Sequence, residues 1–335
     1  MKRILQAAAG LCLLAAPMLA APMLATPAQA QAQTEIKFPF KVNIDTLRGK
    51  MVQTFGDELA KATNNKYKVT IYPGGQLYDG AKAAKAVLLG NVQMTNEPNS
   101  AFTGYTNKAD LLELPFGFDN PDALHAYLDG NKSDLIRKDL EKAGFHVLAF
   151  FDEGPFVIAT KSVLIKQPAD FKGLVIRTSG HPVVVDGLKG MGASTVTLPL
   201  NEVYSGLQQG TITGVYTTFD AFVNEKMWEV APKVMVFPSY GAYFWVANKA
   251  WWDAQPEADR KIMGDLAVKL AKQYDTDVWA NLPEYEAAVK KGGGEVNDVA
   301  KNPAEVKAFQ AAMKPTITKM RAKFGDAAVS AITGD

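Results

Sequence analysis

The sequence is poor in the side chains that most often carry reactive chemistry. It has one cysteine, which excludes a disulfide framework, and three histidines, His125, His146 and His181. The charges are nearly balanced, with 36 Lys and Arg against 35 Asp and Glu. The chain has no excess of basic residues, so its charge gives no indication of a nucleic acid or an anionic membrane as a partner. These shortages argue against a zinc enzyme and against a cysteine hydrolase.

The motifs of common enzymes are missing as well. The chain has no G-x-S-x-G, no G-x-x-x-x-G-K-[ST], no G-x-G-x-x-G and no H-E-x-x-H. Segment 129–134 begins like a calcium loop, but Asp134 stands where that loop requires glycine, which favours a turn. We therefore expect no enzyme activity, no cofactor and no metal ion. An exported enzyme is the least favoured alternative, because a sequence motif does not detect carboxylates that come together only in the folded chain.

The first thirty residues have the pattern of a secretory signal peptide. Lys2 and Arg3 precede an apolar run, and Ala28-Gln29-Ala30 offers a small-x-small cleavage site. A membrane anchor is the competing interpretation, but two prolines inside the run would break such a helix. We expect cleavage after residue 30, a location in the periplasm, and a mature chain without cysteine and without direct membrane insertion.

Strand-like and helix-like segments alternate along the rest of the chain. Thr46 is a candidate N-cap for the first helix, and Gly144 is a candidate C-cap for the fourth. Repeated strand–helix–strand units predict an α/β fold with largely parallel sheets. The expected strands cover residues 35–42, 68–72, 92–95, 146–151, 156–160, 174–177 and 194–198, and the expected helices cover 47–62, 81–89, 121–128, 133–143 and 199–210.

Two long amphipathic helices are expected at the end of the chain, over residues 256–282 and 303–332. A helix of about 27 residues is about 40 Å long, so we expect the first one to cross both domains. The chain has no Ser/Gly-rich linker. The domains are therefore expected to share several short crossings rather than one tether.

Arg177 is the most informative single residue. It ends the apolar strand at 174–177 and is followed by Ser179-Gly180. An arginine at the end of a buried strand is costly to desolvate unless a partner pairs with it. Its planar fork fits a carboxylate in two-point contact, and ligands of open α/β sheets bind at strand ends. An internal salt bridge or a surface arginine explains the residue equally well, and the residues alone leave both interpretations open.

Several short motifs resemble one protein family, and they occur in the family's order over some 180 residues. They are Tyr72-Pro73-Gly74-Gly75-Gln76-Leu77, Leu114-Pro115-Phe116, the strand Lys172 to Arg177, Gly192-Ala193 with the helix Asn201 to Gly210, and the pair Asn248 and Trp252. Together they resemble the extracytoplasmic solute-binding subunits of tripartite ATP-independent periplasmic (TRAP) transporters.

This resemblance implies an α/β, two-lobed periplasmic binding protein fold with a hinge and a long helix spanning both lobes. The first lobe is expected over 31–154 with a return segment at about 214–250, and the second over 155–213 with about 251–335. The resemblance also implies partners: a small organic acid, and the small and large membrane permease subunits that receive it.

The resemblance further implies roles for four residues. Arg177 matches the arginine that pairs with the substrate carboxylate, and Thr217 matches an asparagine that bonds the ligand. Glu97 lies near a carboxylate that lines the pocket, and Leu200 matches a wall position that is often aromatic.

Two departures from the family pattern bear on the ligand. Tyr216-Thr217 stands where E-N is common, and Phe156 stands where many members have a second arginine. Loss of a second cation favours a monocarboxylate or a 2-oxo or 2-hydroxy acid over a dicarboxylate. An apolar or aromatic ligand body fits a pocket with aromatic walls. The aromatic residues proposed for these walls, each of which could instead be a core residue, are Phe156, Tyr216, Phe219, Phe244 and Trp245.

Two alternatives remain open at this point. The first is a receptor for a C4-dicarboxylate, with an unlocated cation in place of the second arginine. The second is a sensory binding protein that presents its ligand to a membrane kinase.

Overall fold

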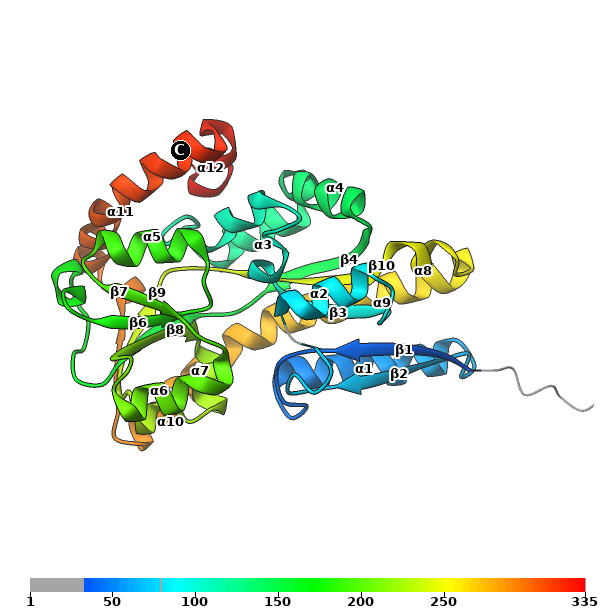
Figure 1. Ribbon diagram of the computed structural model, residues 1–335, viewed down its shortest axis with the longest axis horizontal. Coiled ribbons are helices and arrows are strands. Elements are labelled where there is room, and N and C mark those ends of the chain that lie inside the picture. Colours follow the sequence, from blue (N-terminus) through cyan, green and yellow to red (C-terminus); the bar gives the residue numbers. More distant parts are fainter. Residues whose placement is uncertain (1–32, 79, 335) are drawn as a thin grey trace, which may run out of the picture. The chain divides into compact units, whose positions relative to one another are not determined.

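The computed structural model describes residues 33–78 and 80–334. Figure 1 shows an α/β arrangement in which helices surround separate sheets. The predicted signal peptide, residues 1–30, lies outside the described residues. Among those described, no helix combines the length and the apolar character needed to cross a membrane.

Three sheets form the framework. The largest has the strand order β11-β9-β5-β8-β6-β7, the second has the order β3-β10-β4, and the third pairs β1 with β2. The strands are β1 (Thr34–Pro39), β2 (Tyr67–Tyr72), β3 (Met94–Pro98), β4 (Phe145–Asp152), β5 (Phe156–Thr160), β6 (Val175–Thr178), β7 (Ser194–Thr197), β8 (Gly214–Thr218), β9 (Lys233–Phe237), β10 (Ala242–Asn248) and β11 (Glu295–Asp298).

The prediction of largely parallel sheets is only partly right. β6 is parallel to both β7 and β8, but β5 is antiparallel to both β8 and β9, and β10 is antiparallel to both β3 and β4. The reason is that β5 and β10 each enter a sheet directly from the other sheet. A strand that arrives without a helical crossover is free to pair antiparallel.

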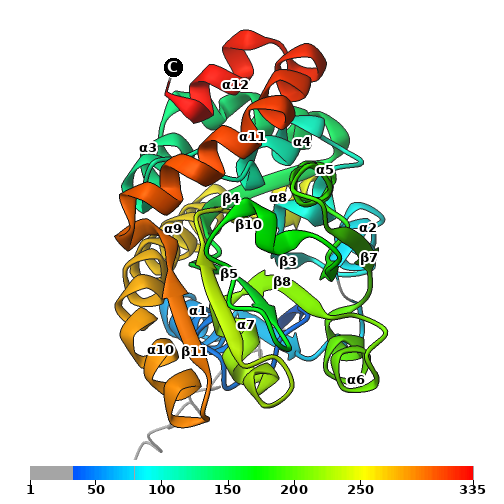
Figure 2. The ribbon, with the colours of Figure 1, turned by 90° about the vertical axis from the view of Figure 1, so that its left-hand side faces the viewer.

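The helices cover the sheets from several sides (Figures 1 and 2). The α-helices are α1 (Leu47–Ala62), α2 (Gly80–Leu88), α3 (Pro121–Asp129), α4 (Asp134–Ala143), α5 (Pro182–Gly190), α6 (Val203–Gln209), α7 (Phe219–Asn224), α8 (Lys249–Asp253), α9 (Glu257–Ala280), α10 (Leu282–Lys291), α11 (Pro303–Phe324) and α12 (Asp326–Thr333). Short 3₁₀ turns include η1 (Asn99–Phe102), η2 (Asn107–Glu113) and η5 (Leu200–Glu202).

Both predicted helix caps are present. The Thr46 side chain accepts a hydrogen bond from the Gly49 backbone N–H at the start of α1. Gly144 ends α4 with φ at 107°, a left-handed conformation that glycine adopts without a Cβ clash. The buried face of α1 packs against β1 and β2, so the cap fixes where that face begins.

Thr46→Ala should lower the free energy of unfolding by about 1 kcal/mol, because an N-cap hydroxyl satisfies a backbone donor that alanine leaves unpaired. Urea unfolding of the protein without residues 1–30 measures this difference. Thr54→Ala is the control, since the exposed Thr54 hydroxyl lies mid-helix and only donates to the Lys50 carbonyl. Its expected change is within about 0.5 kcal/mol. Equal losses in the two variants would contradict the capping role.

The first predicted long helix, 256–282, is present as the single helix α9, and α10 follows it with Pro283 in its first turn. The second, 303–332, is two helices, α11 and α12, with the break at Gly325 (φ 85°, ψ 152°). α9 packs in the core that covers the three-stranded sheet, whereas Tyr285 and Val289 of α10 pack in a core of the six-stranded sheet. The α9–α10 unit therefore spans both parts of the fold.

The chain crosses directly between the two larger sheets twice. β4 leads into β5 through residues 153–155, and β9 leads into β10 through residues 238–241. The Glu153 backbone N–H donates to the Gly241 carbonyl oxygen at 3.0 Å, so the two crossings lie side by side. These short crossings are the kind expected from the absence of a linker.

Strand pairing bears on the predicted lobe limits. β8 and β9 pair with β5 in the six-stranded sheet, and only β10 returns to the three-stranded one. This pairing favours grouping residues 214–237 with the second lobe, whereas the prediction placed about 214–250 with the first. The limits themselves stay a prediction.

Candidate functional site

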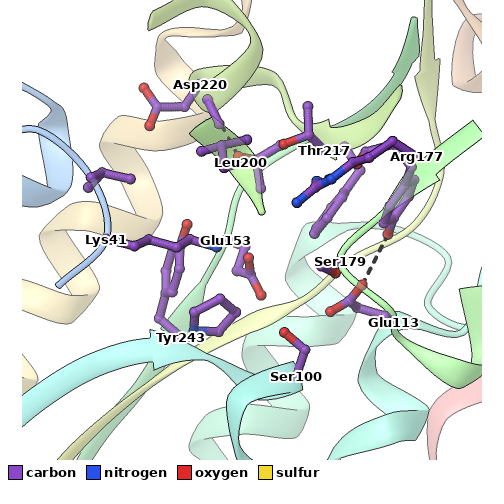
Figure 3. Close-up of a pocket in the computed structure, with 16 residues that line it drawn as sticks. Lys41, Ser100, Glu113, Glu153, Arg177, Ser179, Leu200, Thr217, Asp220 and Tyr243 are labelled. Carbon is purple, nitrogen blue, oxygen red and sulfur yellow. Dashed lines mark hydrogen bonds between the residues drawn. The ribbon is translucent and has the colours of Figure 1, made fainter. Parts of the chain in front are cut away.

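A cavity lies where the two larger sheets face each other beside the crossings. It encloses about 530 Å³ that protein atoms do not fill, including its opening to solvent. Its walls come from both sheets and from the crossing at 153–155 (Figure 3). The lining residues are Lys41, Val42, Pro98, Ser100, Glu113, Glu153, Phe156, Arg177, Ser179, Leu200, Tyr216, Thr217, Thr218, Asp220, Ala221 and Tyr243.

Arg177 lies in β6, between the neighbouring strands β7 and β8. Its Nε and Nη2 donate to the Leu198 carbonyl oxygen at 2.9 and 2.7 Å, and its Nη1 contacts the Tyr216 carbonyl oxygen at 3.4 Å. A guanidinium has five N–H groups, so one N–H remains on each terminal nitrogen. No ion pair joins Arg177 to a carboxylate among the described residues. Burial lowers its pKa to about 10, which keeps it charged at neutral pH.

Tyr216 forms one wall of the cavity together with Phe156. Their rings stack at 4.9 Å between centroids, with an interplanar angle of 15°. The Tyr216 hydroxyl lies 3.0 Å from the Ser239 hydroxyl and 3.4 Å from Oε2 of Glu113, to which it donates. This wall is apolar over its rings and polar at its far end.

Two buried carboxyl groups line the same cavity, Glu113 and Glu153. Loss of hydration raises the pKa of Glu113 to about 7 and that of Glu153 to about 8, and repulsion from Glu113 adds to the rise at Glu153. Oε1 of Glu153 has no hydrogen-bond donor among residues 33–78 and 80–334. The cavity therefore offers a ligand an acceptor that the protein leaves unused.

Lys41 brings a second cation to the cavity. It follows β1 and points into the cavity from the side opposite Arg177 (Figure 3). Burial lowers the pKa of its ammonium, while the charge of Glu153 acts in the opposite direction. A third cation, Arg48, lies behind the cavity wall, with its guanidinium 4.0 Å from the centre of the Tyr243 ring.

The crossing beside the cavity is held by Asp152, the last residue of β4. Its Oδ2 accepts from Nε1 of Trp279 at 2.7 Å and lies 3.0 Å from Nε2 of His125, and its Oδ1 accepts from the Gly154 N–H at 2.7 Å. Oδ1 of Asp275 in α9 accepts from the Asp152 N–H at 2.7 Å. Side chains of α9 and α3 thus fix the backbone of the crossing.

Five of the residues proposed from the sequence meet at this cavity: Arg177, Thr217, Tyr216, Phe156 and Leu200. They come from β5, β6, η5 and β8. Their roles toward a ligand stay a prediction.

The other four proposed residues are placed in the protein interior. Phe244 and Trp245 are neighbours in β10, the central strand of its sheet, so they fill the two cores on its opposite faces. Phe219 packs in a core of the six-stranded sheet, and Glu97 is fully buried near Arg48. None of these four belongs to the described residues that line the cavity.

Lys41, Glu113 and Glu153 were not among the residues predicted from the sequence. A usable signal existed for Glu153, a charged residue directly after an apolar strand, whereas Lys41 lay inside the predicted strand 35–42. Glu113 ends the 3₁₀ turn η2 and had no such signal. Among the described residues, no cluster of His, Cys, Asp and Glu is arranged to hold a metal ion.

Comparisons with known proteins agree with this architecture. A relative from Rhodobacter capsulatus, the C4-dicarboxylate-binding periplasmic protein DctP, is 29% identical over 89% of each chain. The TRAP periplasmic solute binding protein from Sulfurospirillum deleyianum, solved with bound succinate, is 25% identical with a TM-score of 0.83, over 90% of this chain and 98% of that one. A TRAP periplasmic solute binding protein from Pseudomonas aeruginosa, solved with bound L-malate, is 26% identical with a TM-score of 0.79, over 85% of this chain and 99% of that one.

These neighbours share the two-lobed fold with a hinge that the resemblance implied. Residues 41–323 match the family described as bacterial extracellular solute-binding protein, family 7. The chain therefore belongs to that family, the periplasmic solute-binding proteins of TRAP transporters.

Proposed function

We propose that this protein binds a small organic monocarboxylate, a 2-oxo or 2-hydroxy acid with an apolar or aromatic body, and delivers it to TRAP membrane permease subunits. The observation that carries the proposal is Arg177. It is a buried arginine that presents two free N–H groups to the cavity and has no carboxylate partner in the described protein. Such a fork is satisfied by a ligand carboxylate in two-point contact.

The remaining walls support the ligand class. The stacked rings of Phe156 and Tyr216, with Leu200 near them, provide an apolar surface for the body of the acid. The hydroxyl of Thr217 lies on the same side as Arg177 (Figure 3) and is placed to bond an oxygen of the carboxylate or of the 2-substituent. Binding and release without a chemical change of the acid suit a receptor of this family.

A thermal-melt screen of the protein without residues 1–30 tests this function. The panel contains aliphatic and aromatic monocarboxylic acids, 2-oxo and 2-hydroxy acids, and dicarboxylic acids. Ligand at a hundred times its dissociation constant adds about 2.7 kcal/mol of stability, which raises Tm by several degrees for a chain of this size. We expect the largest shifts among the 2-oxo and 2-hydroxy monoacids. No shift with any acid would contradict the proposal.

A C4-dicarboxylate is the second candidate ligand, and Lys41 is the observation that favours it. Phe156 stands where many members of the family have a second arginine. Lys41 could take the place of that cation, since it faces Arg177 across the cavity. The names of the R. capsulatus and S. deleyianum proteins point to the same class. Shifts confined to dicarboxylates in the screen would select this alternative.

A further inference from the structure

Glu153 is placed as a contact for the ligand and not as part of the protein core. The residue is 4% exposed, it lines the cavity, and its Oε1 has no donor in the described part of the chain. A buried acceptor without a donor is costly. The same Oε1 lies 2.8 Å from the position that a Cβ on Gly241 would occupy, so the carboxyl packs tightly against the second crossing. The side chain is therefore held in place even though none of the described residues donates to its Oε1.

The charges around Glu153 define what its carboxyl can bind. Lys41 and Arg48 stabilise its anion, whereas Glu113 and Asp152 repel it, and burial opposes ionisation most strongly. The result is a pKa of about 8, so the carboxyl is largely protonated at neutral pH. A protonated carboxyl accepts one hydrogen bond and donates another.

Three ligand groups could meet this carboxyl. A second carboxylate on the ligand is disfavoured at this point, because Glu113, whose pKa is about 7, is partly ionised at neutral pH and would repel it. An ammonium group is disfavoured because the cation Lys41 already points toward Glu153 (Figure 3). A hydroxyl group fits, since it donates to Oε1 and carries no charge to desolvate.

We propose that Glu153 is a specificity-determining residue that selects carboxylates with a hydroxyl group over the same acids without one. This inference rests on the proposed function, because it requires the ligand carboxylate to lie at Arg177. The Glu153 carboxyl belongs to the crossing, and its backbone is fixed to the second crossing by the bond to Gly241. A ligand hydroxyl therefore contacts the segment that joins the two sheets.

The test compares acids that differ by one hydroxyl group. Propionate is paired with each enantiomer of lactate, and succinate with L-malate, with dissociation constants measured by titration calorimetry at pH 7. In the natural protein we expect the hydroxylated member of at least one pair to bind about 10- to 100-fold more tightly, the usual range for satisfying one buried acceptor. Equal affinities within every pair would overturn the inference while leaving a carboxylate receptor intact.

Two substitutions locate the effect. Glu153→Gln keeps a carbonyl acceptor and should keep most of the affinity difference between the two acids of a pair. Glu153→Leu removes the acceptor and should reduce that affinity difference to less than about threefold, by loss of affinity for the hydroxylated acid alone. Glu97→Gln is the matched control, since Glu97 is equally buried but lies outside the lining. It should leave the difference unchanged.

The outcomes separate the inference from the proposed function. A Glu153→Leu variant that melts normally and still prefers hydroxylated acids overturns the role of Glu153. Failure of every acid to bind the natural protein contradicts the proposed function itself and removes the inference with it. If Glu153→Leu fails to fold, Glu153→Ala replaces it in the test. Loss of the preference for hydroxylated acids in Glu153→Ala supports the role of Glu153, and persistence of that preference overturns it.

Discussion

Arg177→Ala should weaken binding of the ligand acid by about 100- to 1,000-fold. The guanidinium is 5% exposed, and carbonyl oxygens of Leu198 and Tyr216 hold it so that its free N–H groups face the cavity. Removal of one partner of a buried, hydrogen-bonded charge pair costs several kcal/mol, mostly because the other charge is left unpaired. Titration calorimetry with the best acid of the melt screen measures the loss.

The lysine variant sharpens this prediction. Arg177→Lys keeps the positive charge but loses the two-point fork and one of the donors to the carbonyl oxygens, so we expect a loss of about 10-fold or more. Lysine binding as tightly as arginine would show that charge alone anchors the ligand.

Arg137→Ala is the control for the loss of an arginine as such. Arg137 also donates to a backbone carbonyl, that of Val147 at 3.0 Å, and its guanidinium lies 4.8 Å from the centre of the Phe150 ring. It is outside the cavity lining. This variant is expected to lower Tm and to leave the affinity for the acid unchanged.

Gly154→Ala should destabilise the protein by about 2 to 5 kcal/mol. Gly154 has φ at 82°, where a side chain costs about 1 to 2 kcal/mol. A Cβ there would also lie 2.4 Å from Cγ2 of Val278 in α9, a buried contact that cannot form without movement of the helix or the crossing. Overpacking of this kind typically adds about 1 to 3 kcal/mol. Urea unfolding gives the sum.

The two contributions can be separated within this chain. Gly173 has nearly the same φ, 81°, and nothing within 4 Å of its ideal Cβ position, so Gly173→Ala should show the backbone cost alone. The double variant Gly154→Ala with Val278→Ala, compared with both single variants, measures the steric part as a coupling energy. Equal losses for the two glycine variants would mean that α9 does not restrict the crossing.

Local signals in the sequence were sufficient for much of the fold. Thr46 and Gly144 marked helix ends because caps depend on a few neighbouring residues, and the strand at 156–160 was bounded by Gly-Pro and by polar residues. The end of the first long helix was predicted to within two residues, whereas the break at Gly325 was visible as a residue type but lay inside a segment that was predicted as one helix.

The candidate site was harder to predict because its residues meet through tertiary packing. Arg177 was proposed from its place at a strand end, and Glu153, directly after β4, has a similar place. Phe244 and Trp245 were proposed for the ligand walls but lie in core clusters, because an aromatic residue in a central strand looks the same in sequence whether it faces a cavity or a core. Both faces of β10 are covered in the fold, which only the arrangement of the surrounding helices determines.

The hydrogen bond between Glu153 and Gly241 has a mechanical consequence. The two crossings are bonded to each other, and β5 and β9 continue this pairing into the six-stranded sheet. The two crossings therefore form one two-stranded connection between the sheets. A rotation of one sheet relative to the other must bend both crossings together about one axis, since independent motion of either would break that bond.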